Sequence, residues 1–345
     1  YLLIALRTEL RQQQWFDQQQ IAEPNLSQWL DLVALGTVAD VVPLDQVNRA
    51  LVHQGLLRIR SGHSRPGIQA LLRIAGKNPA RLVATDLGFA LGPRLNAAGR
   101  LDDISLGIQC LLCDDPQQAL HTAQELDELN QDRKSIETGM QQQALAIVEQ
   151  LGLDDKSMPA ALCLFQPDWH QGVVGLLASR IKEKYHRPVV AFARGDNGEL
   201  KGSSRSIPGL HIRDALDAVA TQNPGLITKF GGHAMAAGLS LTEDKLAEFE
   251  QAFQQQVAEL ISEDDLQARL VTDGSLDAHQ LSMHTAELLR DAGPWGQQFP
   301  EPCFQGDFRI VQQCIVGEKH LKLVPAPQNQ PEIAIDAIWF NIDTA

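Results

Sequence analysis

The chain has 345 residues, a formal net charge of −14, and 44% hydrophobic and 21% charged residues. This length allows two or three domains with cores of their own, and the composition is typical of a globular protein. The sequence excludes a transmembrane helix, because no stretch of apolar, uncharged residues is long enough to cross a bilayer. The negative charge also disfavours polyanion binding over the whole surface, so any nucleic-acid site must gather its basic residues in one cleft.

The five cysteines are odd in number and scattered along the chain. Only Cys110 and Cys113 form a C-x-x-C, and no second pair or His cluster near them completes a zinc site. We therefore expect buried thiols and a reducing, cytoplasmic compartment. The chain opens inside an apolar run at Tyr1 and ends in a strand-like one, so we expect it to be a fragment of a longer protein.

The first half of the chain predicts an α/β domain followed by a long helix. Residues 1–108 show helical spacing between short apolar runs, and we expect a strand in LDLVALGTVADVVPL that ends at Asp40. Residues 109–152 predict a linking helix, because from Pro116 onward apolar residues recur every three or four positions with a Gln- and Glu-rich face opposite. Such a helix would span roughly 50 Å, enough to join two domains.

The second half predicts another α/β domain and then a β-rich one. In residues 153–262, the strands AALCLF and PVVAFA flank the helix VVGLLASRIKEKY, an order that implies a parallel pair. GELKGSSRS has strand character, IRDALDAVA is helical, and an amphipathic helix follows. Residues 263–345 alternate in polarity after a short helix, which predicts a small, incomplete barrel or sandwich.

The motif GTVADVVPL offers a candidate metal ligand. Asp40 follows the expected strand, and α/β sheets form their sites at the carboxyl ends of strands. A carboxylate there suits Mg²⁺ or Mn²⁺. The alternative is an Asp that only caps a helix or a turn.

The motif GFALGPRLNAAGRLDD places polar side chains among small residues, where a backbone can approach a ligand closely. Guanidinium forks suit phosphate oxygens. The candidate substrate-binding residues here are Arg94, Asn96 and Arg100. The alternative is domain packing, in which the arginines pair with Asp102 or Asp103.

Two motifs in the second domain suit phosphate. In PDWHQGVVGLLASR, His170 and Gly172 precede a helix whose free N–H groups favour an anion; the alternative is a plain strand–helix turn. In KGSSRS, Ser203 and Arg205 share one strand face and could clamp a phosphate. Ser204 and Ser206 would point the other way, and the alternative is a polar edge strand.

The stretch KFGGHAMAAGLSL contains a third candidate. Gly231 and Gly232 let a backbone amide reach a ligand, and His233 could donate to a phosphate oxygen or polarise a phosphoryl group. Metal ligation by His233 is disfavoured, because no other His or carboxylate lies nearby; a tight turn without chemistry is the alternative. Taken together, the motifs supply the local positive cleft that an acidic chain needs to bind nucleic acid, namely Arg94, Arg100, His170, Ser203, Arg205 and His233.

Taken in order, GTVADVVPL, LGPRLNAAGRL, the long helix, HQGVVG, SSRS and GGHAMAAG resemble the RecJ family of single-strand-specific exonucleases in the DHH phosphoesterase superfamily. The resemblance covers nearly the whole chain, and AGPWGQQFPEPCF with GEKHLKL looks like the family's oligonucleotide-binding (OB) barrel. It implies the C-terminal part of a DHH-type domain in residues 1–108, a DHHA1-type substrate-binding domain in 153–262, and an incomplete OB-like domain in 263–345.

The resemblance implies a 5′-to-3′ exonuclease that degrades single-stranded DNA to mononucleotides in recombination and repair, with two Mn²⁺ or Mg²⁺ ions. By motif, Asp40 would be a metal ligand and, with His233, a catalytic residue. Ser203 and Arg205 would hold phosphate near the 5′ end. The other residues implied for the substrate are those lining the nucleotide site and the cleft between the domains, namely Arg94, Asn96, Arg100, His170, Gly172, Gly231, Gly232 and His233.

The chain departs from the family pattern in having no Asp-His-His triplet and no upstream D-x-D pair, which supply most of the metal ligands. We interpret this as truncation before Tyr1 and expect a monomer that is inactive alone. One alternative is a phosphodiesterase for short oligonucleotides or cyclic dinucleotides, which would need neither the long helix nor the barrel. Another is a non-catalytic DNA-binding scaffold, which the retained Asp40 and GGH disfavour. The family also implies delivery by a single-strand-binding protein, without a membrane.

Overall fold

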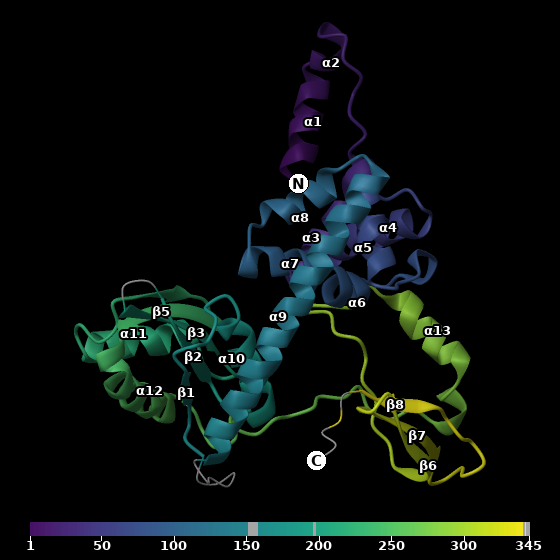
Figure 1. Cartoon of the computed structure of the whole chain (residues 1–345). Coiled ribbons are helices and arrows are strands. Elements are labelled where there is room, and N and C mark those ends of the chain that lie inside the picture. Colours follow the sequence, from purple (N-terminus) through teal and green to yellow (C-terminus); the bar gives the residue numbers. More distant parts are fainter. Residues whose placement is uncertain (151–157, 196–197, 341, 343–345) are drawn as a thin grey trace. The chain divides into compact units, whose positions relative to one another are not determined.

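The computed structural model describes residues 1–150, 158–195, 198–340 and 342 (Figure 1). The chain divides into two compact units. Unit one comprises residues 1–93, 111–120 and 270–345, and unit two comprises residues 94–110 and 121–269. Among the described helices, none combines the length and the apolar character needed to cross a lipid bilayer.

Residues 1–93 form helices only. The α-helices are α1 (Leu2–Gln12), α2 (Trp15–Gln18), α3 (Leu30–Ala39), α4 (Gln46–Arg60), α5 (Pro66–Ile74) and α6 (Ala84–Asp86), with 3₁₀ turns at Leu26–Trp29 and Pro79–Arg81 and a π-helical turn at Leu87–Leu91. The ends of these helices follow known capping preferences. The Asp45 carboxylate accepts the Asn48 N–H at the start of α4, and Pro66 opens α5.

The β-strand predicted before Asp40 is wrong, because these residues form α3. When nearly every residue of a run is apolar, the run shows no hydrophobic periodicity, so the sequence does not distinguish a buried strand from a buried helix. Its ten residues suit a helix, and Ala34 and Leu35 are buried within unit one. Asp40 is therefore the C-terminal cap residue of α3, with its N–H donating to the carbonyl of Gly36.

The last part of unit one matches the prediction of a short helix followed by strands. The helix is α13 (Met283–Ala292), and the strands are β6 (Phe308–Val316), β7 (His320–Pro327) and β8 (Ala337–Trp339). They form an antiparallel sheet in the order β6-β7-β8. Three antiparallel strands fit the predicted partial OB-like fold.

The predicted long helix is confirmed for residues 116–150, whereas residues 109–112 belong to a separate shorter helix and residues 151–152 lie outside the described part of the chain. It follows α7 (Gly92–Leu101) and α8 (Ser105–Leu112) and is α9 (Pro116–Gln150), 35 residues long. Its apolar stripe is buried at the predicted spacing, with Ala119, Ala123, Leu126, Met140 and Ala144 all at most 5% exposed. Residues 116–120 of α9 belong to unit one and the rest to unit two, so α9 joins the two units.

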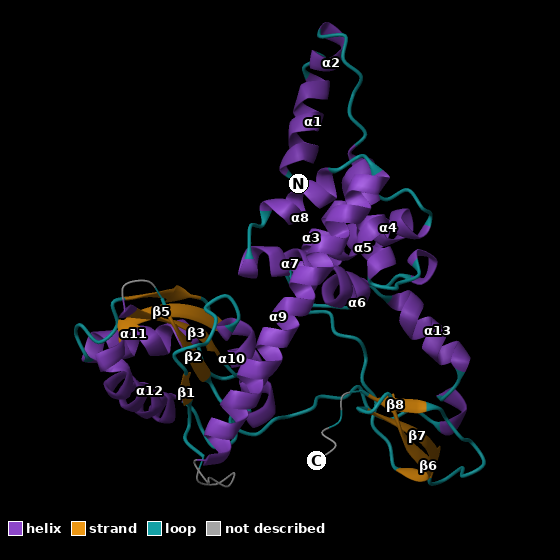
Figure 2. Cartoon of the chain, in the orientation of Figure 1, coloured by secondary structure: helices purple, strands orange, loops and turns teal. Residues whose placement is uncertain are grey.

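Unit two is built on a five-stranded sheet in the order β1-β2-β3-β5-β4 (Figure 2). The strands are β1 (Leu162–Phe165), β2 (Val189–Arg194), β3 (Glu199–Arg205), β4 (Lys229–Gly232) and β5 (Ala236–Thr242). β1 and β2 are parallel, as predicted, and the other pairs are antiparallel.

Helices cover both faces of this sheet. On one face, α9 and α10 (Val174–Tyr185) share a core with Leu162, Val189 and Ala191. On the other face, α11 (Ile212–Gln222) and α12 (Leu246–Leu260) pack on Val190 and Phe192. Because of this three-layer arrangement, successive side chains of β3 face two different layers of helices.

Candidate phosphate-binding site

The candidate site begins at the loop before α10. Trp169 is buried, and its Nε1–H donates to Oε1 of Gln143 on α9 at 2.6 Å. The His170 carbonyl accepts the N–H groups of Val173 and Val174, at 3.0 and 3.2 Å. The N–H of Gly172 donates to Nδ1 of His170 at 3.1 Å. His170 therefore shapes the entry to α10, and its exposed ring stands beside the helix N-terminus.

The predicted alternation along β3 is confirmed. Ser204 and Ser206 are buried and donate to the carbonyls of Ala237 and Leu210, both at 2.8 Å. Ser203 and Arg205 lie on the other face and are only partly buried. Arg205 folds back along the strand, because its Nη1 donates to Oγ of Ser203 at 3.1 Å and to the Ser204 carbonyl at 2.8 Å.

Gly175, in the first turn of α10, makes room for this pair. A Cβ at Gly175 would lie 2.9 Å from both Nη2 of Arg205 and Oγ of Ser203. The hydroxyl and the guanidinium therefore rest directly against the backbone of the first helical turn. The positive end of the helix dipole favours an anion at such a turn, although the N–H groups of Val173 and Val174 already donate to the His170 carbonyl.

Gly175→Ala is expected to weaken phosphate binding several-fold, since about 1 kcal/mol of lost contact corresponds to roughly fivefold. Stability should hold, because alanine favours a helix interior. The measurements are fluorescence anisotropy with a 5′-phosphorylated oligonucleotide and a thermal melt. Gly139→Ala on α9 is the matched control, because a Cβ there meets nothing within 4 Å. Equal binding by Gly175→Ala and wild type would contradict the placement of the site.

Arg100 brings a second guanidinium from α7. Its Nη1 donates to the carbonyl of Gly172 at 3.1 Å. Gly172 itself must be small, because a Cβ there would lie 2.2 Å from the Arg100 carbonyl oxygen. The loop before α10 and the end of α7 are thus in direct backbone contact, and the Arg100 side chain is held beside α10.

The electrostatics of the two arginines point to an anionic ligand. Burial lowers the pKa of Arg205, and the charge of Arg100 lowers it further. Burial also lowers the pKa of Arg100, followed by the charge of Arg133. Both remain cations at neutral pH. Within the described residues neither has an ion-pair partner, so a phosphate group would relieve their mutual repulsion.

Other predicted residues lie outside this group. Arg94 pairs with Asp127 on α9, with Nε and Oδ1 2.8 Å apart, which is a partner that we did not predict. Asn96 is exposed on α7. The structure thus gathers Arg100, Gly172, Ser203 and Arg205, with His170 beside them, and gives Arg94 a packing role between α7 and α9.

The GGH stretch ends β4 with Gly231 and Gly232 and begins the turn to β5 with His233. Gly232 pairs with Ala237, and the His233 N–H donates to the Ala236 carbonyl at 2.9 Å. Ala236 also pairs with Arg205 across β3 and β5. Strands lie about 4.8 Å apart, so His233 stands about 10 Å from Arg205 along the sheet. The His233 side chain is exposed.

Asp40 lies in unit one, whereas the group around Arg205 belongs to unit two. Its side chain is exposed, and Val41 next to it has a φ of 54°, a strained value for a β-branched residue. Among the described residues, no three His, Cys, Asp or Glu side chains cluster to hold a metal ion. These residues therefore do not fit a divalent-ion site by themselves, and Asp40 is at most one ligand of such a site. The five cysteines form no disulfide bonds, and of the C-x-x-C pair Cys110 is buried and Cys113 is partly buried.

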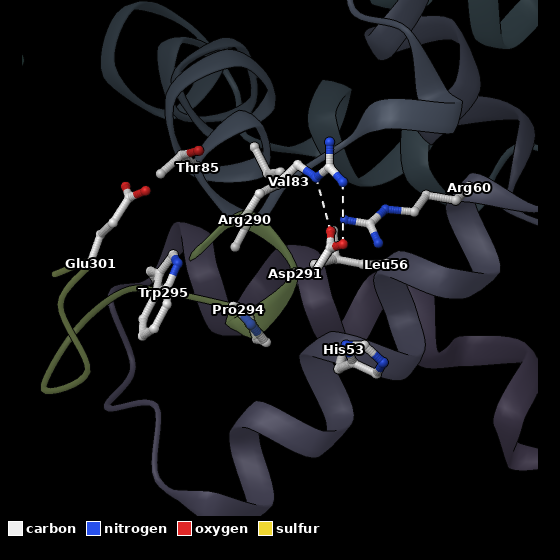
Figure 3. Close-up of a pocket in the computed structure, with 12 residues that line it drawn as sticks. His53, Leu56, Arg60, Val83, Thr85, Arg290, Asp291, Pro294, Trp295 and Glu301 are labelled. Carbon is white, nitrogen blue, oxygen red and sulfur yellow. Dashed lines mark hydrogen bonds and ion pairs between the residues drawn. The ribbon is translucent and has the colours of Figure 1, made fainter. Parts of the chain in front are cut away.

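Unit one also contains a cavity of ≈ 360 Å³ (Figure 3). His53, Arg60, Trp295 and the Arg290–Asp291 pair line it. Arg290 donates from Nε and Nη2 to the two carboxylate oxygens of Asp291, at 2.9 and 3.2 Å, and this holds the pKa of Asp291 below its usual range. Arg290 is thus already neutralised by a carboxylate, unlike Arg205.

Sequence reasoning did not identify Gly175, Trp169 or the polar residues of α9 as parts of this region. A signal existed for Gly175, since it is the second glycine of HQGVVG and stands where a helix begins. No signal existed for the contact between Trp169 and Gln143, because 26 residues separate them. Such contacts between distant residues can be recognised only in the folded structure, where α9 packs on the sheet.

Comparison with known proteins agrees with these features. Residues 156–259 match the DHHA1 domain family, and residues 272–345 match the RecJ OB domain family. The single-stranded-DNA-specific exonuclease RecJ of Salmonella typhimurium is 58% identical over 344 residues, which are 100% of this chain and 59% of that protein. The chain thus spans about three fifths of the length of this relative and of its counterpart in Escherichia coli.

Solved structures of RecJ also match this chain. The crystal structure of RecJ from Thermus thermophilus with Mg²⁺ matches at a TM-score of 0.77 and 29% identity, covering 96% of this chain and 49% of that one. The structure of the same protein with Mn²⁺ matches at 0.77 and 29%, covering 96% and 46%. The chain is thus similar to RecJ proteins along its whole length and contains a DHHA1 domain and a RecJ OB domain.

Proposed function

We propose that this chain is the strand-holding part of a 5′-to-3′ exonuclease that hydrolyses single-stranded DNA to mononucleotides in recombination and repair. The observation that carries the proposal is the pair Arg100 and Arg205, two partly buried guanidiniums without a carboxylate partner among the described residues, beside Ser203 and the start of α10. Hydrogen-bond donors and positive charge converge there, as a terminal phosphate requires.

Several parts of unit two have roles in this proposal. Arg205 and Ser203 hold a phosphate near the 5′ end, and Arg100 supplies the second positive charge. His170 and the positive end of the α10 dipole complete the pocket. His233, about two strand spacings away, faces a neighbouring phosphate or nucleotide. This assignment agrees with an acidic protein that keeps its positive charge in one place.

The exonuclease reaction depends on Mn²⁺ or Mg²⁺ in this proposal, because relatives of known structure were crystallised with each ion. Such ions activate water and stabilise charge on the leaving oxygen. Asp40 is the ligand that this chain contributes, and the other ligands come from parts of the relatives that have no counterpart here. The chain's own residues bind and orient the strand.

The chain alone is therefore expected to show no Mn²⁺-dependent release of nucleotides from single-stranded DNA. Fused to the part of the Salmonella relative that has no counterpart here, it should release mononucleotides from the 5′ end. Duplex DNA should resist, because both strands would have to enter a site built for one. The assay uses 5′- and 3′-labelled oligonucleotides on a denaturing gel. Nuclease activity of the unfused chain, or an inactive fusion that is folded, would contradict the proposal.

Two alternatives make different predictions. A phosphodiesterase for short oligonucleotides or cyclic dinucleotides would cleave those substrates faster than a long strand, whereas α9 and the OB domain favour a long one. A non-catalytic scaffold would bind strands but stay inactive in the fusion. Cytoplasmic location, a monomeric state and delivery of the substrate by a single-strand-binding protein remain parts of the proposal.

A further inference from the structure

Helix α4 lies in a strongly basic stretch of this acidic chain. Residues 46–85 contain seven Lys and Arg residues and no Asp or Glu, whereas the whole chain has 43 acidic and 29 basic residues. On α4, the side chains of Arg49, His53 and Arg60 are four and seven residues apart. Residues at this spacing fall on one side of a helix. The helix therefore presents a row of basic groups along one face.

This row lines two adjoining cavities in unit one. Arg60 and His53 line the cavity of ≈ 360 Å³ shown in Figure 3, and His53 and Arg49 line a second cavity of ≈ 420 Å³. Gly293 and Pro294 also line both. Because these three residues are common to both cavities, the cavities form one groove along α4, which we call the α4 groove. At a rise of 1.5 Å per residue, Arg49 and Arg60 lie roughly 16 Å apart along it.

The opposite wall of the α4 groove contains two stacked aromatic rings. The guanidinium carbon of Arg49 lies 3.6 Å from the ring centre of Phe299, and Phe299 stacks on Trp295 with ring centres 5.0 Å apart. The Trp295 ring also lines the larger part of Figure 3, and its Nε1–H donates to a backbone carbonyl at 2.9 Å. The N–H of Leu44, just before α4, donates to the Gln297 carbonyl at 2.8 Å. These contacts hold the aromatic segment against α4.

Two arginines of the α4 groove, Arg49 and Arg60, form no ion pair within the part of the chain that the structure describes. Nε of Arg60 donates to a backbone carbonyl at 2.8 Å, and this bond fixes the side chain. The third arginine, Arg290, already binds both oxygens of Asp291. Glu301 lies across the cavity from Arg60 (Figure 3). The α4 side of the groove thus carries positive charge that a polyanion can neutralise.

We propose that the α4 groove binds single-stranded DNA away from its 5′ end, with Arg49 and Arg60 on phosphates and Trp295 against a base. Proteins that hold single strands combine a basic groove with aromatic rings on which bases stack. The row of cations is long enough for several phosphates, since even a stacked strand has one every 3.4 Å or so. An acidic peptide would meet the same arginines, but its carboxylates gain nothing from stacking on an indole.

This inference rests on the proposed function, because it adds a second contact for the same substrate. The pocket around Arg205 recognises the terminal phosphate, so its contribution depends on the chemistry of the 5′ end. The α4 groove contacts internal phosphates and bases, so its contribution is the same for a 5′-phosphate and a 5′-hydroxyl strand. The two sites can therefore be separated by experiment.

The test is the salt dependence of the chain's affinity for oligothymidylates of about 20 nucleotides, with a 5′-phosphate or a 5′-hydroxyl. Arg49→Gln/Arg60→Gln should bind both strands about tenfold more weakly. Its plot of log K against log salt should be shallower by about 1.4, because each phosphate contact on a single strand contributes about 0.7. The preference for the 5′-phosphate should stay, since Arg205 is intact. Trp295→Leu should weaken binding about tenfold without changing the slope, because it removes stacking and no charge.

Arg73→Gln/Arg81→Gln is the matched control. Both residues are exposed, belong to the same basic stretch and line neither cavity, so the control removes the same charge beside the α4 groove. Its slope should stay close to that of the wild type. If loss of the contact between Arg49 and Phe299 unfolds the double variant, the single variant Arg60→Gln decides, with an expected decrease in slope of about 0.7.

The outcomes separate the α4 groove from the proposed function. A wild-type chain that binds neither oligonucleotide would overturn the proposed function and the groove together. Wild-type binding with a slope that Arg49→Gln/Arg60→Gln leaves unchanged, or that the control lowers equally, would overturn the groove alone. The groove would also be wrong if the double variant kept its affinity for DNA and lost affinity for an oligoglutamate peptide.

Discussion

Arg205→Ala is expected to abolish most of the discrimination between 5′-phosphorylated and 5′-hydroxyl single-stranded DNA. A hydrogen bond to a charged group contributes about 1.5–3 kcal/mol, so the affinity for the phosphorylated strand should fall about 10- to 100-fold. The affinity for the 5′-hydroxyl strand should change much less. Anisotropy titrations of both oligonucleotides at one fixed salt concentration measure the difference, since phosphate contacts depend strongly on salt.

Arg213→Ala is the matched control for Arg205→Ala. Arg213 is exposed on α11, which packs on the opposite face of the sheet, and its contact with Asp214 is long at 3.9 Å. The Arg213→Ala substitution removes the same charge from unit two and leaves the pocket around Arg205 unchanged. If both variants lose affinity for the two oligonucleotides equally, Arg205 acts only through net charge, and the clamp assignment is wrong.

Gly232→Ala is expected to destabilise unit two by about 2–4 kcal/mol, in the range of severe steric conflicts in a packed structure. A Cβ at Gly232 would lie 2.4 Å from Cα of Ala237 and 2.5 Å from the Ala236 carbonyl oxygen, and its φ is +153°. The β4–β5 turn must therefore open, and His233 must move with it. Urea unfolding measures the loss as a lower midpoint.

Gly231→Ala tests the neighbouring glycine in the same hairpin. A Cβ there meets nothing within 4 Å, and Gly231 is exposed. Its unfolding midpoint should stay close to that of the wild type. A substantial loss in Gly231→Ala, or none in Gly232→Ala, would show that the hairpin is not shaped as described. The contrast also separates the two glycines of the GGH motif, because close packing requires only the second one.

The sequence was most informative where one face of an element is buried and the other is not. The two-residue period of β3 placed Ser203 and Arg205 together and Ser204 and Ser206 opposite them, because side chains alternate along any strand. The stripe of α9 was equally readable over many turns. In contrast, α3 is apolar nearly all round, so its periodicity is hidden and the prediction of a strand failed.

The partners of the arginines could not be predicted from spacing. Arg94 and Arg100 lie on the same short helix, yet Arg94 pairs with Asp127 on α9 while Arg100 reaches the carbonyl of Gly172. Residue type favoured phosphate for both, and only tertiary packing separates them. The burial of Glu137, which pairs with Arg133 and Arg180, was hidden for the same reason, since a Glu on a Gln-rich helix normally faces solvent.

The alternation of β3 has a consequence for how this protein can change over evolutionary time. Ser204 fastens β3 to β5 and Ser206, directly after β3, bonds the Leu210 carbonyl, whereas Ser203 and Arg205 turn their polar groups to the face that we propose for the ligand. Adjacent positions are therefore subject to separate selective pressures, one for folding and one for recognition. Drift at odd positions can alter what is bound while the even positions keep the scaffold intact, so a new specificity can arise without a loss of structure.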